Sequence, residues 1–115
     1  MPLEQDCTRT QDRHATKARA LVTRENDAMR AVIYGHAADV SVTGLSLAVP
    51  VKMDVGESLL VELENPLQRF KVRCRARVQH VQPTEQGGYR VGCSVATRLS
   101  ARDVQLLKSN QSEGW

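Results

Sequence analysis

The chain has 115 residues, of which 41% are hydrophobic and 25% charged, and 16 Lys and Arg against 13 Asp and Glu give a formal net charge of +3. This length suits one domain with a modest core, and the composition excludes a disordered polyelectrolyte. No apolar run approaches the roughly 18 residues of a membrane span. Aromatic residues make up only 3%, which is few for a protein that binds nucleic acid by stacking bases.

The N-terminal segment is polar and mixed in charge. Residues 1–18 are expected to form a flexible basic arm that carries Arg9, Arg13 and Lys17. The arm lacks the apolar stretch of a secretory signal, and Pro2 stands where myristoylation requires glycine, so we expect neither a signal nor a lipid anchor.

Short β-strands separated by turn residues are predicted after the arm. They are expected over residues 19–24, 29–42, 43–49, 57–63, 70–79 and 89–95. The clearest is 70–79, where alternate residues are apolar and the residues between them are Lys, Arg or Gln, a period that excludes an amphipathic helix. The outward basic stripe consists of Lys71, Arg73, Arg75 and Arg77.

The cysteines show no pattern of a reactive or metal-binding group. Cys7, Cys74 and Cys93 are odd in number and far apart, which matches neither a zinc site nor a paired framework. Cys74 and Cys93 fall on apolar stripes, so we expect them to pack in the core. Free thiols are typical of a reduced, cytoplasmic protein, and no metal is expected.

The period changes near the C-terminus, where residues 99–110 predict a short helix. Ser100 is a suitable N-cap, and Asp103 follows three residues later as its capping-box partner. The fold class is therefore expected to be all-β: a small six-stranded antiparallel β-barrel with a short C-terminal α-helix that covers one open end. We assign the barrel and helix to residues 19–110 and a tail to 111–115.

One turn between predicted strands carries candidate binding groups. In Asp39-Val40-Ser41-Val42-Thr43-Gly44, the side chains of Asp39 and Ser41 are expected to share one face. Gly44 permits either an unusual φ or the close approach of a ligand. A carboxylate beside a hydroxyl suits a flat ligand with paired N–H donors, such as the edge of guanine.

The basic arm supplies groups of the opposite kind. Arg9, Arg13 and Lys17 are spaced four residues apart. Arginine offers a planar fork for phosphate or for the O6/N7 edge of guanine, and lysine offers a point charge. Arg90, which enters the last predicted strand, is a further candidate contact.

These features resemble the PilZ family of cyclic di-GMP receptors, which are small six-stranded barrels with a C-terminal helix, RxxxR in an N-terminal arm and DxSxxG on the barrel. DxSxxG is complete here as Asp39, Ser41 and Gly44, and the arm motif falls at Arg13 and Lys17. Lys17 lies 39 − 17 = 22 positions before Asp39, a separation similar to the family's. The resemblance covers roughly residues 9–109 and implies cyclic di-GMP as ligand, without a cofactor.

The resemblance also implies roles for individual residues. Arg13 would contact phosphate and guanine, Asp39 and Ser41 would contact the guanine edge, and Gly44 would let the backbone approach the ligand. Lys17 departs from the family's second arginine and supplies only a charge, at a cost of about 1–3 kcal/mol for a lost bidentate contact. In an alternative register, Arg9 and Arg13 form the RxxxR pair.

The leading hypothesis is a non-enzymatic receptor whose arm becomes ordered on nucleotide binding and which then signals to a protein partner. One alternative is a degenerate PilZ adaptor that binds a protein and no nucleotide, for which Lys17 is the motivating residue. The other is a small-barrel nucleic-acid binder that uses the basic stripe, and the few aromatic residues count against it. No activated nucleophile, Walker loop or acid–base pair is recognisable, so an enzyme is not expected.

Overall fold

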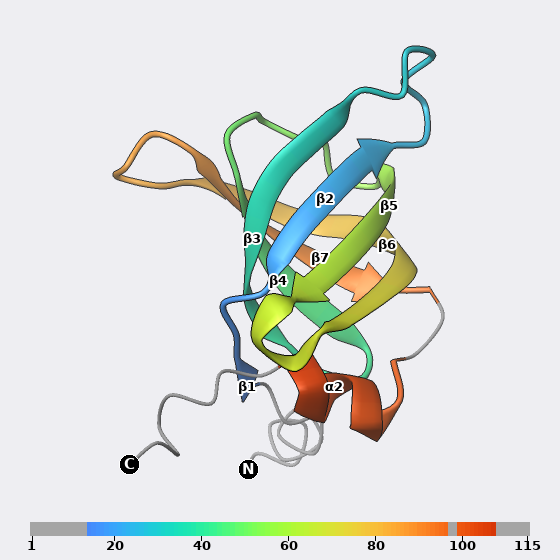
Figure 1. Cartoon of the computed structure of the whole chain (residues 1–115). Helices are drawn as coiled ribbons and strands as arrows, with labels where there is room; N and C mark the ends of the chain where they lie inside the picture. Colours follow the sequence, from blue (N-terminus) through green and yellow to red (C-terminus); the bar gives the residue numbers. More distant parts are fainter. Residues whose placement is uncertain (1–13, 97–98, 108–115) are drawn as a thin grey trace, which may run out of the picture.

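Strands of alternating sequence make up most of the structure, a computed structural model that describes residues 14–96 and 99–107. In this part of the chain six longer strands are present, together with a two-residue strand, a 3₁₀ turn and one α-helix (Figure 1). In chain order they are β1 (His14–Ala15), β2 (Arg19–Arg24), β3 (Val32–Val40), β4 (Gly44–Val49), β5 (Ser58–Asn65), η1 (Pro66–Gln68), β6 (Phe70–Pro83), β7 (Tyr89–Val95) and α2 (Ala101–Leu107).

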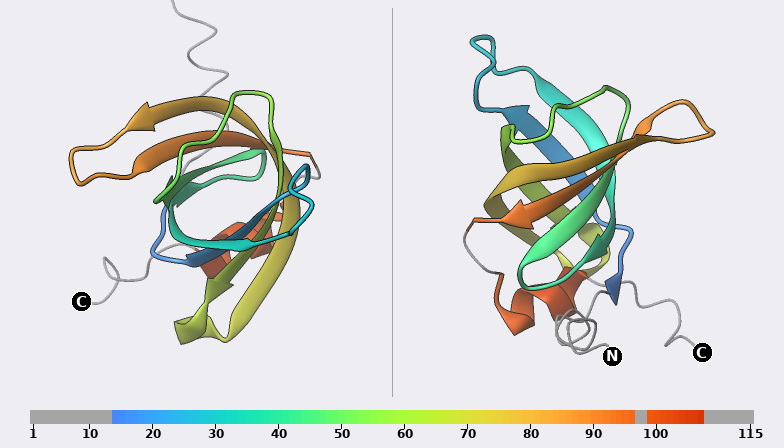
Figure 2. Two further views of the ribbon diagram at one scale, coloured as in Figure 1. Left: turned by 90° about the horizontal axis from the view of Figure 1, so that it is seen from above. Right: turned by 180° about the vertical axis from the view of Figure 1, so that it is seen from behind.

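The longer strands close into a barrel. Neighbours run in the order β2–β5–β6–β7–β4–β3, every pairing is antiparallel, and β3 pairs with both β4 and β2 to complete the ring. The view from above in Figure 2 shows the strands curving around one interior. Strand β1 pairs with the end of β3 beyond β2. The predicted six-stranded antiparallel barrel with a C-terminal helix is confirmed.

Every second residue of each strand fills the interior. The largest fully buried side chains are those of Leu45, Leu47, Met53, Leu59, Leu63, Leu107, Val22, Val40, Val61, Val78 and Val91. Cys74 and Cys93 are free and buried in this core, which confirms their predicted packing role. Burial raises the pKa of the Cys74 thiol to about 11 and that of Cys93 to about 12, so both stay protonated and unreactive near neutral pH.

Helix α2 covers the lower end of the barrel in Figure 1, with Leu99, Val104 and Leu107 turned into the core. The predicted capping box is present: Ser100 Oγ accepts from the Asp103 N–H at 3.0 Å, and Asp103 accepts from the Ser100 N–H at 3.2 Å. The described part of the helix is Ala101–Leu107, and residues 108–110 of the predicted helix lie outside the described residues.

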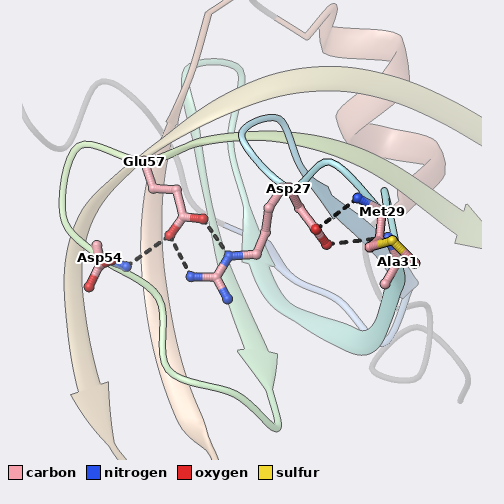
Figure 3. Close-up of polar contacts among 6 residues, drawn as sticks. Asp27, Met29, Ala31, Asp54 and Glu57 are labelled. Carbon is pink, nitrogen blue, oxygen red and sulfur yellow. Dashed lines mark hydrogen bonds and ion pairs between the residues drawn. The ribbon is translucent and has the colours of Figure 1, made fainter.

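The opposite end is held by a bidentate ion pair between β2 and the start of β5 (Figure 3). The Arg24 guanidinium donates to both carboxylate oxygens of Glu57, which also accepts from the Asp54 N–H at 3.0 Å. The Glu57 side chain is 3% exposed. Its hydrogen bond to Arg24 holds the pKa of Glu57 below the ordinary value against the opposing effect of burial.

Two strands depart from strict alternation. The register shifts between Ala37 and Asp39 on β3 and between Val78 and His80 on β6. Each β-bulge adds one residue to its strand and reverses which residues face inward beyond it. Strand β6 therefore continues to Pro83, past the predicted end at 79, because the pattern after the bulge resumes in the other phase.

Candidate functional site

Asp39 faces outward because of the bulge that precedes it. Ala37 and Val40 are both buried although three positions separate them, because the bulge absorbs Ala38 as an extra residue and so leaves Asp39 pointing away from the core. Asp39 is half-buried and lies opposite Ala15 on one side and Ser46 on the other.

Arg90 joins this group from β7. Its Nε donates to Ser46 Oγ at 2.8 Å, and its Nη2 lies 3.8 Å from Asp39 Oδ2. The structure thus brings together a carboxylate, a hydroxyl and a guanidinium from three adjacent strands. The Arg90 side chain is 47% exposed, so it can move away from Asp39 at small cost.

Ser41 and Gly44 form the turn that follows β3. The buried Ser41 hydroxyl accepts from the Gly44 N–H at 3.1 Å and donates to the Gly44 carbonyl at 3.3 Å. Gly44 lies in β4 opposite Ser94, and the described glycines with positive φ are Gly56 and Gly87. Of the two reasons given for Gly44, the unusual φ is therefore wrong, and close approach of a ligand stays a prediction.

The described root of the arm lies directly beside Asp39. Ala15 pairs with Asp39 itself, the Thr16 N–H donates to the Ala38 carbonyl at 3.2 Å, and the Ala37 N–H donates to the Ala18 carbonyl at 2.9 Å. Lys17 stands in this paired segment and is exposed. Arg9 and Arg13 lie outside the described residues.

A buried hydroxyl ties this root to the helix. Thr16, which is 5% exposed, donates through Oγ1 to the Leu107 carbonyl and accepts from the Ala18 N–H at 3.0 Å. The nearby Leu106 carbonyl accepts from the Asn65 side chain at 2.8 Å. The arm root, the end of β3 and the last turn of α2 therefore form one hydrogen-bonded unit.

Beyond Asp39 the neighbouring strands carry small residues. We call the outer surface of β3, β4 and β7 the site face, and its residues are Asp39, Ser46, Ala48, Arg90 and Gly92. Ser46 pairs with Asp39 and with Gly92, and Gly92 pairs with His80 across the bulge of β6. A Cβ on Gly92 would lie 2.2 Å from His80 Nε2, so the imidazole covers the glycine.

A hollow of about 480 Å³ adjoins these residues. Its lining includes Tyr34, His36, Ala48 and Arg90, together with the turn that joins β6 and β7. The sequence analysis missed Ser46, Gly92 and His80, since only their cross-strand register brings them beside Asp39. The site face offers an acceptor at Asp39, donors at Arg90 and a short exposed side chain at Ala48.

The basic stripe of β6 is largely paired with carboxylates of neighbouring elements. Lys71 and Arg73 both approach Glu62, at 3.6 and 3.4 Å, and Arg75 contacts Glu25 at 2.6 Å. Interleaved carboxylates repel phosphates, which weakens the nucleic-acid alternative. Among residues 14–96 and 99–107, no group of His, Cys, Asp and Glu is arranged to hold a metal ion.

Comparison with known protein families gives a match over most of the chain. The family model described as PilZ domain matches residues 8–110. No curated protein matches the chain. Within the described part of the chain, no helix has both the length and the apolar character required to span a membrane.

Two solved structures share the fold at low sequence identity. The inhibitor of motility MotI/DgrA of Bacillus subtilis superposes with a TM-score of 0.65 and 14% identity, over 86% of this chain and 47% of that one, so this chain spans about half of it. The PilZ domain of YcgR from Escherichia coli, solved with c-di-GMP, gives a TM-score of 0.63 and 12% identity over 86% and 85%.

Proposed function

The chain belongs to the PilZ domain family, and from this membership we propose that it is a receptor for cyclic di-GMP that acts by binding and not by catalysis. The nucleotide occupies the site face beside Asp39, and the cationic arm closes over it. The observation that supports this most strongly is the pairing of Ala15 with Asp39. This pairing holds the root of the arm beside the carboxylate of the DxSxxG pattern.

Each residue has a distinct proposed role. Asp39 accepts hydrogen bonds from the guanine N1–H and 2-amino groups, and Arg90 leaves the carboxylate to contact a phosphate. Ser41 contacts the guanine edge and also holds its own turn, and Gly44 gives the ligand access to the backbone. Such charge-assisted hydrogen bonds contribute about 1.5–3 kcal/mol each.

The cationic arm completes the site in this proposal. Arg13 supplies a planar fork for phosphate and guanine, Lys17 neutralises a phosphate, and Arg9 adds a further charge or replaces Lys17 in the alternative register. The closing of the arm creates a new surface for a protein partner, and the Thr16 link to Leu107 extends the change to α2. The free thiols of Cys74 and Cys93 agree with a proposed cytoplasmic location.

Isothermal titration calorimetry with cyclic di-GMP tests the proposal. We expect binding with a measurable heat for the full chain and at least about tenfold weaker binding for Arg13→Ala, since one charged hydrogen bond is lost. Arg102→Ala, an exposed arginine on α2, is the matched control and should bind like the wild type. Absence of heat with the wild type would overturn the assignment. So would an affinity of Arg13→Ala equal to that of Arg102→Ala.

The second candidate is the adaptor that binds a protein without nucleotide. It is favoured by Lys17 in the place of an arginine and by the Ser41 hydroxyl, whose hydrogen bonds within the turn are already made. Under this alternative the titration gives no heat, also in the Lys17→Arg variant.

A further inference from the structure

A second hollow lies along the outer surface of β2, β5 and β6. It measures about 630 Å³, and its apolar floor includes Leu21, Val32 and Leu60, while Arg73 and Arg75 stand at its rim. We call this surface the groove face. A smaller hollow of about 290 Å³ continues it past Leu21 toward Tyr34.

The strand register explains why the apolar and basic groups lie side by side. One row across the sheet runs Val32, Thr23, Leu60 and Arg75, and the next runs Tyr34, Leu21, Glu62 and Arg73. Val32 is 44% exposed and Tyr34 is 70% exposed. Apolar contact area and cationic groups are therefore within reach of one bound segment.

The charges of the groove face are unequal. Glu62 is shared between Lys71 and Arg73, so one carboxylate faces two cations. The Arg73 side chain is 85% exposed, and its contact with Glu62 is 3.4 Å long, which leaves most of the guanidinium fork open to a carboxylate from outside.

We propose that the groove face binds an acidic amphipathic segment of a partner protein. Apolar side chains of the segment cover Leu21, Val32 and Leu60, and a carboxylate of the segment pairs with Arg73. A protein segment is favoured over nucleic acid because the apolar floor formed by Leu21, Val32 and Leu60 has no counterpart on a phosphate backbone.

The groove face and the site face adjoin on β3. Tyr34 lines both the hollow beside Arg90 and the smaller hollow that continues the groove, whereas Leu60 and Arg73 lie on β5 and β6, with β2 between β5 and β3. A partner segment centred on Leu60 and Arg73 therefore leaves Asp39 and Arg90 uncovered.

The test uses the ¹⁵N-labelled full chain and two synthetic helical peptides with identical leucine positions, one bearing glutamates and the other lysines. We expect the leucine–glutamate peptide to shift the amide resonances of Leu21, Leu60 and Arg73. Arg73→Glu should weaken its binding by about tenfold or more. Glu62→Gln should strengthen it about threefold, because a competitor for Arg73 is removed.

Two controls separate charge at the groove from charge in general. Arg102→Glu, on α2, should leave the peptide affinity unchanged, and so should Asp39→Ala on the site face. The proposal is wrong if the leucine–lysine peptide binds equally well or if neither peptide shifts groove resonances. It is also wrong if oligothymidylate shifts them in preference to the acidic peptide.

Discussion

The two outer faces of this barrel share one backbone pattern and differ in the length of their side chains. On the site face, Ala48 is short and exposed, so a flat ligand can approach the strands closely there, whereas Ser46 is buried and Gly92 lies under the His80 imidazole. On the groove face, Leu60, Arg73 and their neighbours are long, so they form walls and a floor instead. The two proposals assign to one sheet a surface for a rigid small molecule and an adjoining surface for an adaptable protein segment.

The largest effect is expected on the free energy of unfolding, from the ion pair between Arg24 and Glu57 at the barrel end. Glu57→Gln removes the charge that Arg24 contacts, and we expect the free energy of unfolding to fall by about 1.5–3 kcal/mol, because the half-buried Arg24 guanidinium loses its charged hydrogen-bond partner. Urea denaturation at neutral pH measures this loss. Both faces should keep their ligand preferences once the protein is folded.

The effect should also depend on pH. Since the pKa of Glu57 is lowered in the folded state, its stabilising contribution is complete above the ordinary value of 4.5 and is lost as the pH falls through the lowered folded value. The difference between wild type and Glu57→Gln should therefore shrink in acid. Glu85→Gln, exposed in the β6–β7 turn, should show no such difference at either pH.

Asp39→Ala tests whether the two faces are chemically distinct. We expect cyclic di-GMP affinity to fall by about 100-fold, equivalent to about 3 kcal/mol for two lost hydrogen bonds to a carboxylate. The matched variant Glu62→Ala removes a carboxylate that also contacts an arginine, but on the groove face. Calorimetry should find its nucleotide affinity unchanged, and an equal loss in both variants would contradict a specific site at Asp39.

Ala48→Leu tests the importance of short side chains. Ala48 is exposed and lines the hollow beside Arg90, so a larger residue should be tolerated by the fold while it obstructs the ligand. We expect about tenfold weaker nucleotide binding with a melting temperature close to that of the wild type. Thr23→Leu on the groove face provides the control, and unaltered binding by Ala48→Leu would place the nucleotide elsewhere.

Lys17→Arg should give the smallest change and sharpens the distinction between receptor and adaptor. A planar fork beside Asp39 adds about 1 kcal/mol of binding free energy, or about fivefold in affinity for cyclic di-GMP. Fluorescence or calorimetric titration can resolve this gain. If neither the wild type nor the variant binds, the adaptor alternative is favoured.

The sequence predicted most of the fold because the alternation of apolar and charged residues over 70–78 is strong and the Ser100–Asp103 pattern specifies a helix start. It did not predict β1, whose two residues carry no periodicity. Arg90 was a candidate contact, but the place of Ser46 between Arg90 and Asp39 was out of reach, because strand register across a closed barrel depends on all pairings at once.

The expectation for Ser41 shows the same limit at a single side chain. Its position in DxSxxG indicates a ligand contact, whereas the structure shows a buried hydroxyl that already bonds both backbone groups of Gly44. A motif identifies which residues matter, but the local hydrogen bonds decide how much of each group is available to a ligand.

Strand β3 holds one residue more between Ala37 and Val40 than strict alternation allows, and the bulge that absorbs Ala38 keeps the Asp39 carboxylate outside. If the strand ran through this segment without the bulge, the carboxylate would point into the interior and Val40 would point to solvent. A change that moves the bulge would thus abolish recognition with every motif residue still present, and two sequences with the same letters at Asp39, Ser41 and Gly44 need not be functionally equivalent.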